Sequence, residues 1–354
     1  MKRLVGLILA LLSVCTLITG CKAEIDEDEG CKWSAWTCTE EAKIGKKTTF
    51  ESVWEDCSKK RTHRTRASKG LEYAENTDGT LTVTGIGSCD DEFLYIASEH
   101  NGKKVTAIGE NAFDGARGIK YIYVSGGIEK IMPHAFIACS DLLCVTLAQG
   151  VKELGMYAFF ECVSMYDVAL PEGITAINDY TFAGCYALRN IDLPTTTSHI
   201  GTGAFAGCKS IKEFVLPGGV TTLSQHMLDA CFALERVDIS SAQGVLPESI
   251  FAACESLKSV RIPEGIHTID TKAFIGCSAL ESVYIPAGVT TIVSRDGESP
   301  FYMCDPEILT VKCEAGSEGA NWDDGYDVCN YIEYDDTTKP TEAVRIKFEF
   351  GQKG

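Results

Sequence analysis

A 23-residue repeat constrains this chain more than any other feature of its sequence. An aromatic or aliphatic residue recurs every 23 positions, and alanine or cysteine follows three residues later each time. The eight recurring residues, which we call the core anchors, are Phe113, Phe136, Phe159, Phe182, Phe205, Leu228, Phe251 and Phe274. A fixed period of this length with apolar anchors predicts a solenoid, in which stacked coils bury one continuous core.

The unit that begins at residue 259 shows the coil that this repeat predicts. Residues 259–262 alternate in the manner of a strand, and Pro263 ends the strand. Gly265 then marks a turn before the apolar pair Ile266 and Ile269. Residues 272–276 are predicted to form a brief helical turn that closes the coil. Each core anchor is expected to point inward, toward the anchors of the neighbouring coils.

The cysteines follow the repeat rather than a disulfide framework. Eight of the 17 cysteines share one repeat column, in which Ala116 takes the place of cysteine in the first unit. They are Cys139, Cys162, Cys185, Cys208, Cys231, Cys254, Cys277 and Cys304. Alternation with alanine is typical of a small buried position, where a thiol behaves as a small hydrophobe. A serine at Cys208 is therefore expected to lack a hydrogen-bond partner. Partial disulfide pairing or metal binding is the alternative, although parallel side chains do not suit a disulfide torsion.

The repeat resembles a known family. The pattern A-F-x-x-C-x-x-L-x-x-V-x-I-P-x-G-V-x-x-I is carried here by Ala273, Phe274, Cys277, Leu280, Val283, Ile285, Pro286, Gly288, Val289 and Ile292. It is similar to the BspA-like leucine-rich-repeat family of bacterial surface proteins, over about residues 71–329. The resemblance implies a right-handed, β-rich leucine-rich-repeat solenoid with short helical turns, capped at both ends. It also implies attachment to host matrix proteins such as fibronectin and fibrinogen.

The first 20 residues predict export. Lys2 and Arg3 precede a short apolar run, as in a signal peptide. Residues 18–21, Ile-Thr-Gly-Cys, resemble the lipobox of bacterial lipoproteins, which implies cleavage before Cys21 and acylation of Cys21. An ordinary secretory signal is the alternative. Lys22, in the place where aspartate would resemble an inner-membrane retention signal, favours the outer surface.

Composition shifts divide the remainder of the chain. Residues 21–30 hold Cys21 and an acidic tether, and residues 31–70 form a small module with three tryptophans, three cysteines, ten Lys/Arg and five Asp/Glu. Its Trp and Arg spacing resembles a thrombospondin type 1 module; a disulfide-stapled or partly disordered extension is the alternative. Residues 71–112 are predicted to be the N-terminal cap, 113–312 the repeats, and 313–354 the C-terminal cap and tail. Residues 343–350 alternate as a last strand, and a Cys313–Cys329 disulfide is one arrangement of this end.

The net charge and the absence of catalytic motifs limit the functions that this chain can have. The net charge of −18 argues against nucleic acid as a partner, because phosphate binding needs a basic face. No metalloprotease motif, P-loop or nucleophile elbow occurs, and His134 and His226 share a column but stand four repeats apart. The sequence therefore predicts neither an enzyme nor a bound cofactor or metal.

The predicted binding site is the outward face of the strands. Strand alternation places Val260 and Ile262 in the core, so that Ser259 and Arg261 face out. The corresponding outward positions give an acidic centre with tyrosines at both ends. The candidate ligand-binding residues are Tyr121, Tyr123, Asp167, Asp192, Glu213, Arg236, Asp238, Arg261 and Tyr284. We expect a protein or glycan ligand, including extracellular matrix; a structural or glycan-capturing envelope lipoprotein without a host ligand is the alternative.

Overall fold

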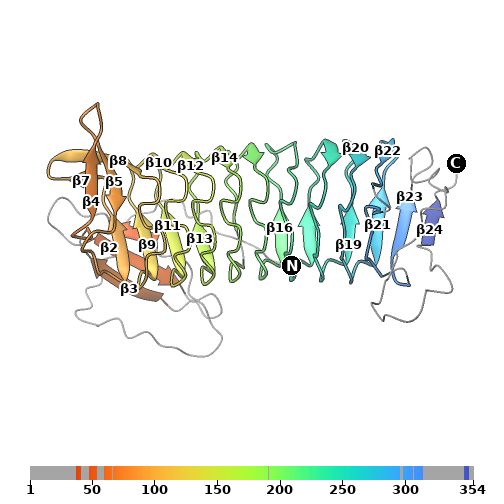
Figure 1. Ribbon diagram of the computed structural model, residues 1–354, viewed down its shortest axis with the longest axis horizontal. Helices are drawn as coiled ribbons and strands as arrows, with labels where there is room; N and C mark the ends of the chain where they lie inside the picture. Colours follow the sequence, from red (N-terminus) through yellow and green to blue (C-terminus); the bar gives the residue numbers. More distant parts are fainter. Residues whose placement is uncertain are drawn as a thin grey trace.

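The computed structural model describes residues 37–40, 48–53, 60–65, 67–189, 191–295, 298–305, 307–313 and 347–350. Over the repeats the chain forms a long solenoid whose coils stack along one axis, from the orange N-terminal coils to the blue C-terminal ones in Figure 1. The core anchors lie inside it and are buried in every coil from Phe113 to Phe274, and Phe301 is the buried anchor of the next coil. The predicted solenoid is confirmed.

Most coils contribute one short strand to each of two rows, which we call the first and second rows. The first row holds β5 (Leu81–Gly85), β8 (Lys103–Ile108), β10 (Lys130–Ile131), β12 (Glu153–Leu154), β14 (Ala176–Ile177), β15 (His199–Ile200), β18 (Gly244–Leu246), β20 (Ile266–Ile269) and β22 (Thr291–Ile292). The second row holds β6 (Phe93–Ile96), β9 (Tyr121–Val124), β11 (Cys144–Leu147), β13 (Asp167–Ala169), β16 (Glu213–Val215), β17 (Arg236–Asp238), β19 (Ser259–Arg261), β21 (Ser282–Ile285) and β23 (Thr310–Cys313).

Parallel pairing carries the repeat from one coil to the next. Within the second row Val145 lies opposite both Ile122 and Val168, each 23 residues away, so equivalent side chains stack in columns. The second row is divided into the sheets β6–β9–β11–β13, β16–β17 and β19–β21–β23–β24. Residues 191–193, which the repeat predicts to be a strand between β13 and β16, form no strand.

Both ends of the described solenoid depart from the repeat. At the N-terminal end β4 (Glu72–Glu75) pairs antiparallel with β5 across the expected turn at residues 76–79, and β7 (Glu99–His100) pairs antiparallel with β8. At the other end β24 (Lys347–Phe350) pairs in parallel with β23. The predicted last strand is thus present, and its partner is β23. A separate antiparallel sheet comprises β1 (Thr37–Glu40), β2 (Thr48–Val53) and β3 (Lys60–Thr65).

The third side of each coil is a turn rather than the helical turn that we expected. In residues 111–116 the backbone N–H groups alternate between two kinds of acceptor. Asp114 and Ala116 donate to carbonyls three residues earlier, whereas Phe113 and Gly115 donate to the next coil. Half of the donors are therefore used between coils, which leaves no run of α-helical bonds. No helix forms in the described residues.

Stacked phenylalanine rings fill the core. Neighbouring anchor rings lie nearly parallel, with centroids 4.9 Å apart for Phe113 and Phe136 and 5.5 Å apart for Phe274 and Phe301. Leu228 interrupts the ladder, and there Phe214 of β16 packs edge-on against Phe205 with centroids 5.3 Å apart. The other residues of β6, β9, β11, β13, β17, β19, β21 and β23 in the column of Phe214 are valine, isoleucine or leucine. A larger side chain therefore compensates for the smaller anchor.

Candidate ligand-binding face

The structure aligns the predicted outward residues in columns where the strands pair. Tyr121 and Asp167 both lie beside Cys144 in the pairing of β9, β11 and β13. Further along, Glu213 lies opposite Arg236, and Arg261 lies opposite Tyr284. Asp192 does not belong to a strand, because residues 191–193 form none, and it is exposed on the segment between β13 and β16. The predicted face is therefore made of separate pieces rather than one continuous sheet.

The N-terminal piece is not open to a ligand. Tyr121 and Tyr123 alternate with the core residues Ile122 and Val124, yet they are only 8% and 4% exposed. Our expectation that these tyrosines form an exposed end of the face is wrong. The repeat distinguishes inward from outward positions, but it carries no information about a second layer that covers the outward ones. Asp167, on β13, is half-buried.

The C-terminal piece is exposed. Val215 is 59% exposed, and the side chain of Arg236 is 70% exposed. Asp238, Ser259 and Arg261 are exposed as well. We call this piece, on β16, β17, β19, β21 and β23, the open strand face. Its outward residues are Glu213, Val215, Arg236, Asp238, Ser259, Arg261, Ser282, Tyr284, Thr310 and Lys312.

Contacts between coils orient the cationic side chains of the open strand face. Arg236 forms an ion pair with Glu213 of the preceding coil. The guanidinium of Arg261 lies 4.1 Å from the ring centroid of Tyr284 in the following coil, which is a cation–π contact. Lys312 extends the column of Tyr284 on β23. The face therefore presents oriented arginines and a half-buried aromatic ring beside the carboxylates of Glu213 and Asp238.

The cysteine column is buried, as expected, and it also makes hydrogen bonds that the sequence did not reveal. Each thiol donates to the backbone carbonyl of a core anchor 26 or 30 residues earlier; for example, Cys208 Sγ lies 3.2 Å from Phe182 O. The remaining donors are Cys139, Cys162, Cys185, Cys231, Cys254, Cys277 and Cys304. Burial raises the pKa of Cys277 to about 12. Their burial and their bonds to backbone carbonyls make these thiols core residues rather than accessible nucleophiles.

The described residues hold no other arrangement suited to chemistry. No group of three or more His, Cys, Asp or Glu side chains within them could hold a metal ion. His226 contacts Asp229 at 3.2 Å, and His134 stacks on Tyr157 with ring centroids 5.1 Å apart. Neither histidine reaches the other, as their positions in the repeat predicted. In the part of the chain that the structure describes, no helix has the length and apolar content to cross a membrane.

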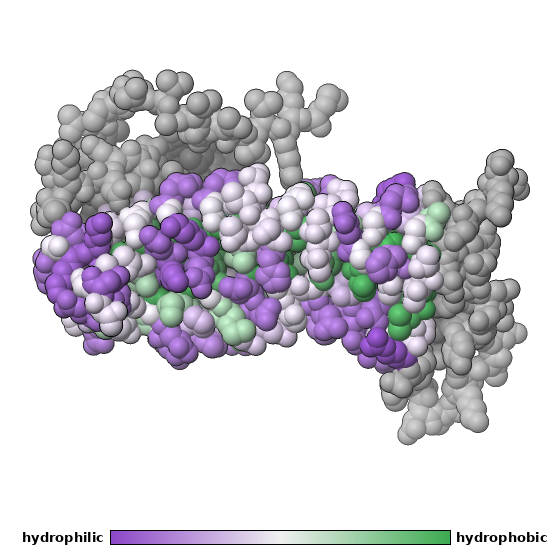
Figure 2. All heavy atoms as spheres, turned by 90° about the horizontal axis from the view of Figure 1, so that it is seen from above, coloured by the Kyte–Doolittle hydropathy of each residue, from purple (hydrophilic) through white to green (hydrophobic). Residues whose placement is uncertain are grey.

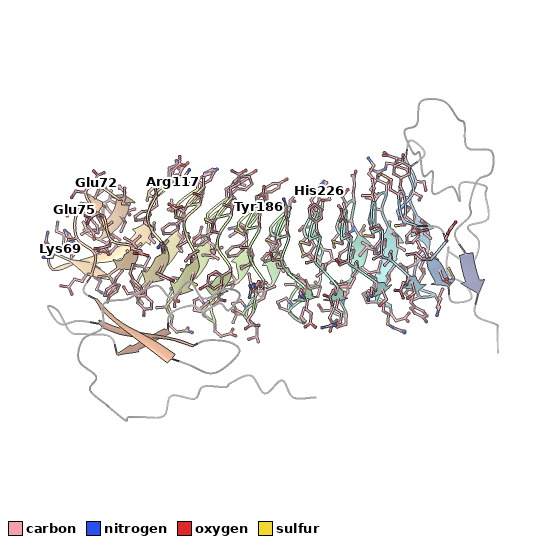
Figure 3. The ribbon with its side chains drawn as sticks, turned by 90° about the horizontal axis from the view of Figure 1, so that it is seen from below. Lys69, Glu72, Glu75, Arg117, Tyr186 and His226 are labelled. Atoms are coloured by element: carbon pink, nitrogen blue, oxygen red, sulfur yellow. The ribbon has the colours of Figure 1, made fainter. Side chains whose placement is uncertain are left out.

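The turn side of the coils carries a column of aromatic rings that we did not predict from the sequence. The rings of His134, Tyr157 and Tyr180 stack on consecutive coils, with Tyr157 and Tyr180 centroids 5.0 Å apart. Beyond them, Lys209 Nζ lies 3.9 Å from the ring centroid of Tyr186. The 23-residue spacing of His134, Tyr157 and Tyr180 could have revealed this column. Arg117, Tyr186 and His226 mark this side of the solenoid in Figure 3.

The surface around these rows is polar. Seen from above in Figure 2, the described residues are mostly hydrophilic, and hydrophobic residues show only in small areas between them. Ion pairs between neighbouring coils contribute to this polarity. Lys130 pairs with Glu153 at 3.2 Å, and Lys152 pairs with Glu129 at 3.1 Å, on the first row. Cys21 lies outside the described residues, so the structure does not test the predicted lipid attachment.

One solved structure, with a TM-score of 0.50, supports the fold, and other solved structures are also similar in sequence. A leucine-rich repeat protein from Bacteroides ovatus is 23% identical, with a TM-score of 0.50 over 72% of this chain and 62% of its own. This chain thus spans less than two thirds of that protein. A T. pallidum leucine-rich repeat protein is 23% identical, with a TM-score of 0.39 over 62% of this chain and 80% of its own. A leucine-rich cell surface protein from Faecalibacterium prausnitzii is 24% identical, with a TM-score of 0.32 over 70% and 93%.

The family assignment comes from the repeats. No curated protein matches the sequence. The family described as BspA type Leucine rich repeat region (6 copies) matches residues 95–208 and 175–306, which together make up more than half of the chain. The matched residues are those that form the stacked coils between β6 and the last buried anchor, Phe301. This chain therefore belongs to the BspA-type leucine-rich-repeat family.

Proposed function

We propose that this protein is a lipid-attached bacterial surface protein that binds a protein ligand through its open strand face. The observation that carries the proposal is the group of Arg236, Arg261 and Tyr284 on the open strand face. Both arginines are exposed, and the guanidinium of Arg261 lies over the ring of Tyr284. Arginine and tyrosine are enriched among the residues that dominate protein–protein binding energy. A matrix protein of the host is the ligand class that the family resemblance favours.

The open strand face suits a protein ligand better than a small molecule. Its side chains project from short parallel strands onto one surface, and their backbones are held by neighbouring coils. The preformed backbone lowers the entropy that binding must remove. The carboxylates of Glu213 and Asp238 beside the arginines give the surface both signs of charge, which favours selective contact.

A triple variant tests this surface. Replacing Arg236, Arg261 and Tyr284 by alanine is expected to weaken ligand binding by about 2 kcal/mol or more, following the behaviour of interface hot spots. Residues 24–354 would first be screened against matrix proteins, mucins and glycans. The matched control is Lys130→Ala with Glu153→Ala, an exposed ion pair on the first row. If the triple variant binds as tightly as the parent and the control, the open strand face is not the site.

The surface location has a separate test. If Cys21 carries acyl chains, the protein partitions into detergent, because several chains on one residue exceed what stable attachment requires. Cys21→Ala should release a soluble form, and unchanged partitioning would exclude lipid attachment through Cys21. Protease treatment of whole cells should digest the exposed protein. Survival of the protein in that experiment would favour the structural envelope lipoprotein instead.

A further inference from the structure

The outward side of the first coils carries a second apolar cluster, separate from the core. We call it the outer aromatic patch. It consists of Phe93, Tyr95, Tyr121, Tyr123, Cys144 and Tyr166, all of which are buried. Its rings contact one another across the strands, since the Tyr95 and Tyr123 centroids lie 5.6 Å apart and the Phe93 and Tyr121 centroids 6.1 Å apart.

Strand geometry puts this patch on the outside of the solenoid. Successive side chains of a strand point to opposite faces, and Ile122 and Val124 of β9 belong to the core. Tyr121 and Tyr123 must therefore point away from it. At the equivalent outward positions of later coils, Val215 and Arg236 are exposed. The burial of the patch is thus not a general property of the second row, and a local layer covers the outward side of β6, β9 and β11.

The chain itself leads to this patch. The N–H of Ser68 donates to Tyr95 O at 2.9 Å, and the Ser68 hydroxyl accepts from the N–H of Tyr95 at 3.0 Å. The residues that precede Ser68 therefore enter the fold at the edge of β6, beside the aromatic rings. Figures 1 and 3 place the sheet β1–β2–β3 next to these N-terminal coils, on the side of the solenoid away from Arg117, Tyr186 and His226.

The composition of residues 31–66 suits this position. It includes Trp33, Trp36 and Trp54, whereas residues 67–313 contain no tryptophan. Buried aromatic side chains bury roughly 150–250 Å² each, so the five rings of the patch would expose several hundred Å² if nothing covered them. Patches of that size are rare on the surface of monomeric proteins. Tryptophan and tyrosine rings also gain from edge and offset stacking with one another.

We infer that residues 31–66 dock on the outer aromatic patch of the same chain. The basic, tryptophan-containing module is then a second layer over the first coils rather than a separate ligand-binding domain. The face that a ligand can reach begins beyond it. This inference does not depend on the identity or existence of a ligand.

Tryptophan fluorescence of the full chain tests the docking. In a Trp322→Phe background the remaining tryptophans all lie in residues 31–66, so acrylamide quenching reports on the module alone. Tyr121→Ala with Tyr123→Ala should raise the quenching constant at least twofold, while the solenoid keeps its circular dichroism. Tyr121→Phe with Tyr123→Phe should restore the parent value. The matched control, Arg236→Ala with Asp238→Ala, alters the same two columns on β17 and should change nothing.

Other outcomes overturn the inference. An unchanged quenching constant in the tyrosine-to-alanine variant would mean that another layer covers the patch. Protection that disappears on dilution, together with a dimer in sedimentation, would assign the cover to a second copy. Tyr166→Ala, at the other edge of the patch, provides a milder variant if the double substitution prevents folding. It should raise quenching by a smaller factor, and no rise at all would likewise contradict docking.

Discussion

Individual residues in the turns adopt backbone angles that most side chains avoid. Two positions four residues apart in the turns have positive φ, as at Lys272 (+58°) and Gly276 (+71°) in one coil and Ser249 (+55°) and Ala253 (+52°) in the preceding one. The second of these positions is glycine in several coils, including Gly184, Gly207 and Gly276. An L-residue with a Cβ atom in this region costs roughly 1–2 kcal/mol.

Replacing alanine at this position should therefore stabilise the protein. Ala253 has φ of +52°, and Ala253→Gly removes its strain while adding about 0.5–1 kcal/mol of chain entropy to the unfolded state. The expected net gain is about 0.5–1 kcal/mol in the free energy of unfolding. The control is Ala204→Gly, at a fully buried position outside the positive-φ set, which should destabilise by roughly 1–2 kcal/mol. Denaturant titration of both variants checks the opposite signs.

The structure revises the expected effect of replacing a buried thiol by serine. Because Phe182 O accepts from Cys208 Sγ at 3.2 Å, a serine at this position keeps an acceptor that the sequence did not reveal. We now expect Cys208→Ser and Cys208→Ala to lie within about 1 kcal/mol of each other, since one net hydrogen bond offsets part of the cost of burying a hydroxyl. Chemical unfolding measures both. A serine variant less stable than the alanine variant by clearly more than about 1 kcal/mol would contradict this geometry, because that is the cost of a buried hydroxyl without a partner.

At the scale of one element, coils adjust their volumes locally. Leu228 is smaller than the other core anchors, and Phe214 is larger than the valine, isoleucine and leucine residues of the other coils in its column. Both are buried, and Phe214 contacts the ring of Phe205. The coil thus conserves volume, as close packing of a protein interior requires.

This compensation can be measured as coupling. Leu228→Phe alone should destabilise by about 1–3 kcal/mol, because it adds volume to a filled core. Phe214→Val alone should destabilise by leaving a cavity. The double variant should be more stable than the sum of the two effects predicts, by roughly 1 kcal/mol. A double-mutant cycle in denaturant provides the measurement, and additive effects would show that Phe214 does not fill the space beside Leu228.

The repeat allowed much of each coil to be predicted, within physical limits. Inward positions such as Val260 and Ile262 follow from the period and from strand alternation, and both are buried. The turns could not be predicted, because residues such as Tyr157 and Lys272 adopt positive φ without being glycine. The burial of Tyr121 and Tyr123 could not be predicted either. It depends on a layer outside the repeat, about which a 23-residue period says nothing.

At the scale of the whole molecule, the thiols link stability to pH. Burial raises the pKa of Cys162, Cys185, Cys208, Cys231, Cys254 and Cys277 above the ordinary value. A group whose pKa is raised by folding stabilises the fold fully below its unfolded pKa. This contribution is lost as the pH rises toward the folded pKa, because only the unfolded chain releases its protons there.

Stability should therefore fall steeply under alkaline conditions. For Cys277 the window runs from pH 9 to about pH 12, and the loss is about 1.4 kcal/mol for each pH unit. Several thiols acting together should unfold the solenoid within this range. Cys277→Ala should reduce the slope of unfolding free energy against pH by about one thiol's share. Circular dichroism between pH 8 and 12 checks this, and a slope independent of that substitution would contradict the linkage.

The stacking of parallel strands has a mechanical consequence. Hydrogen bonds between coils, such as those from Phe113 to Ala135 and from Phe136 to Ala158, run from one coil to the next along the solenoid axis. Tension applied between the two ends would break the hydrogen bonds between one pair of neighbouring coils before those of the next pair. Each 23-residue coil that peels away would add roughly 75 Å of extended chain. Such a protein would yield in even steps and absorb work at each one, where a compact domain would give way in a single event.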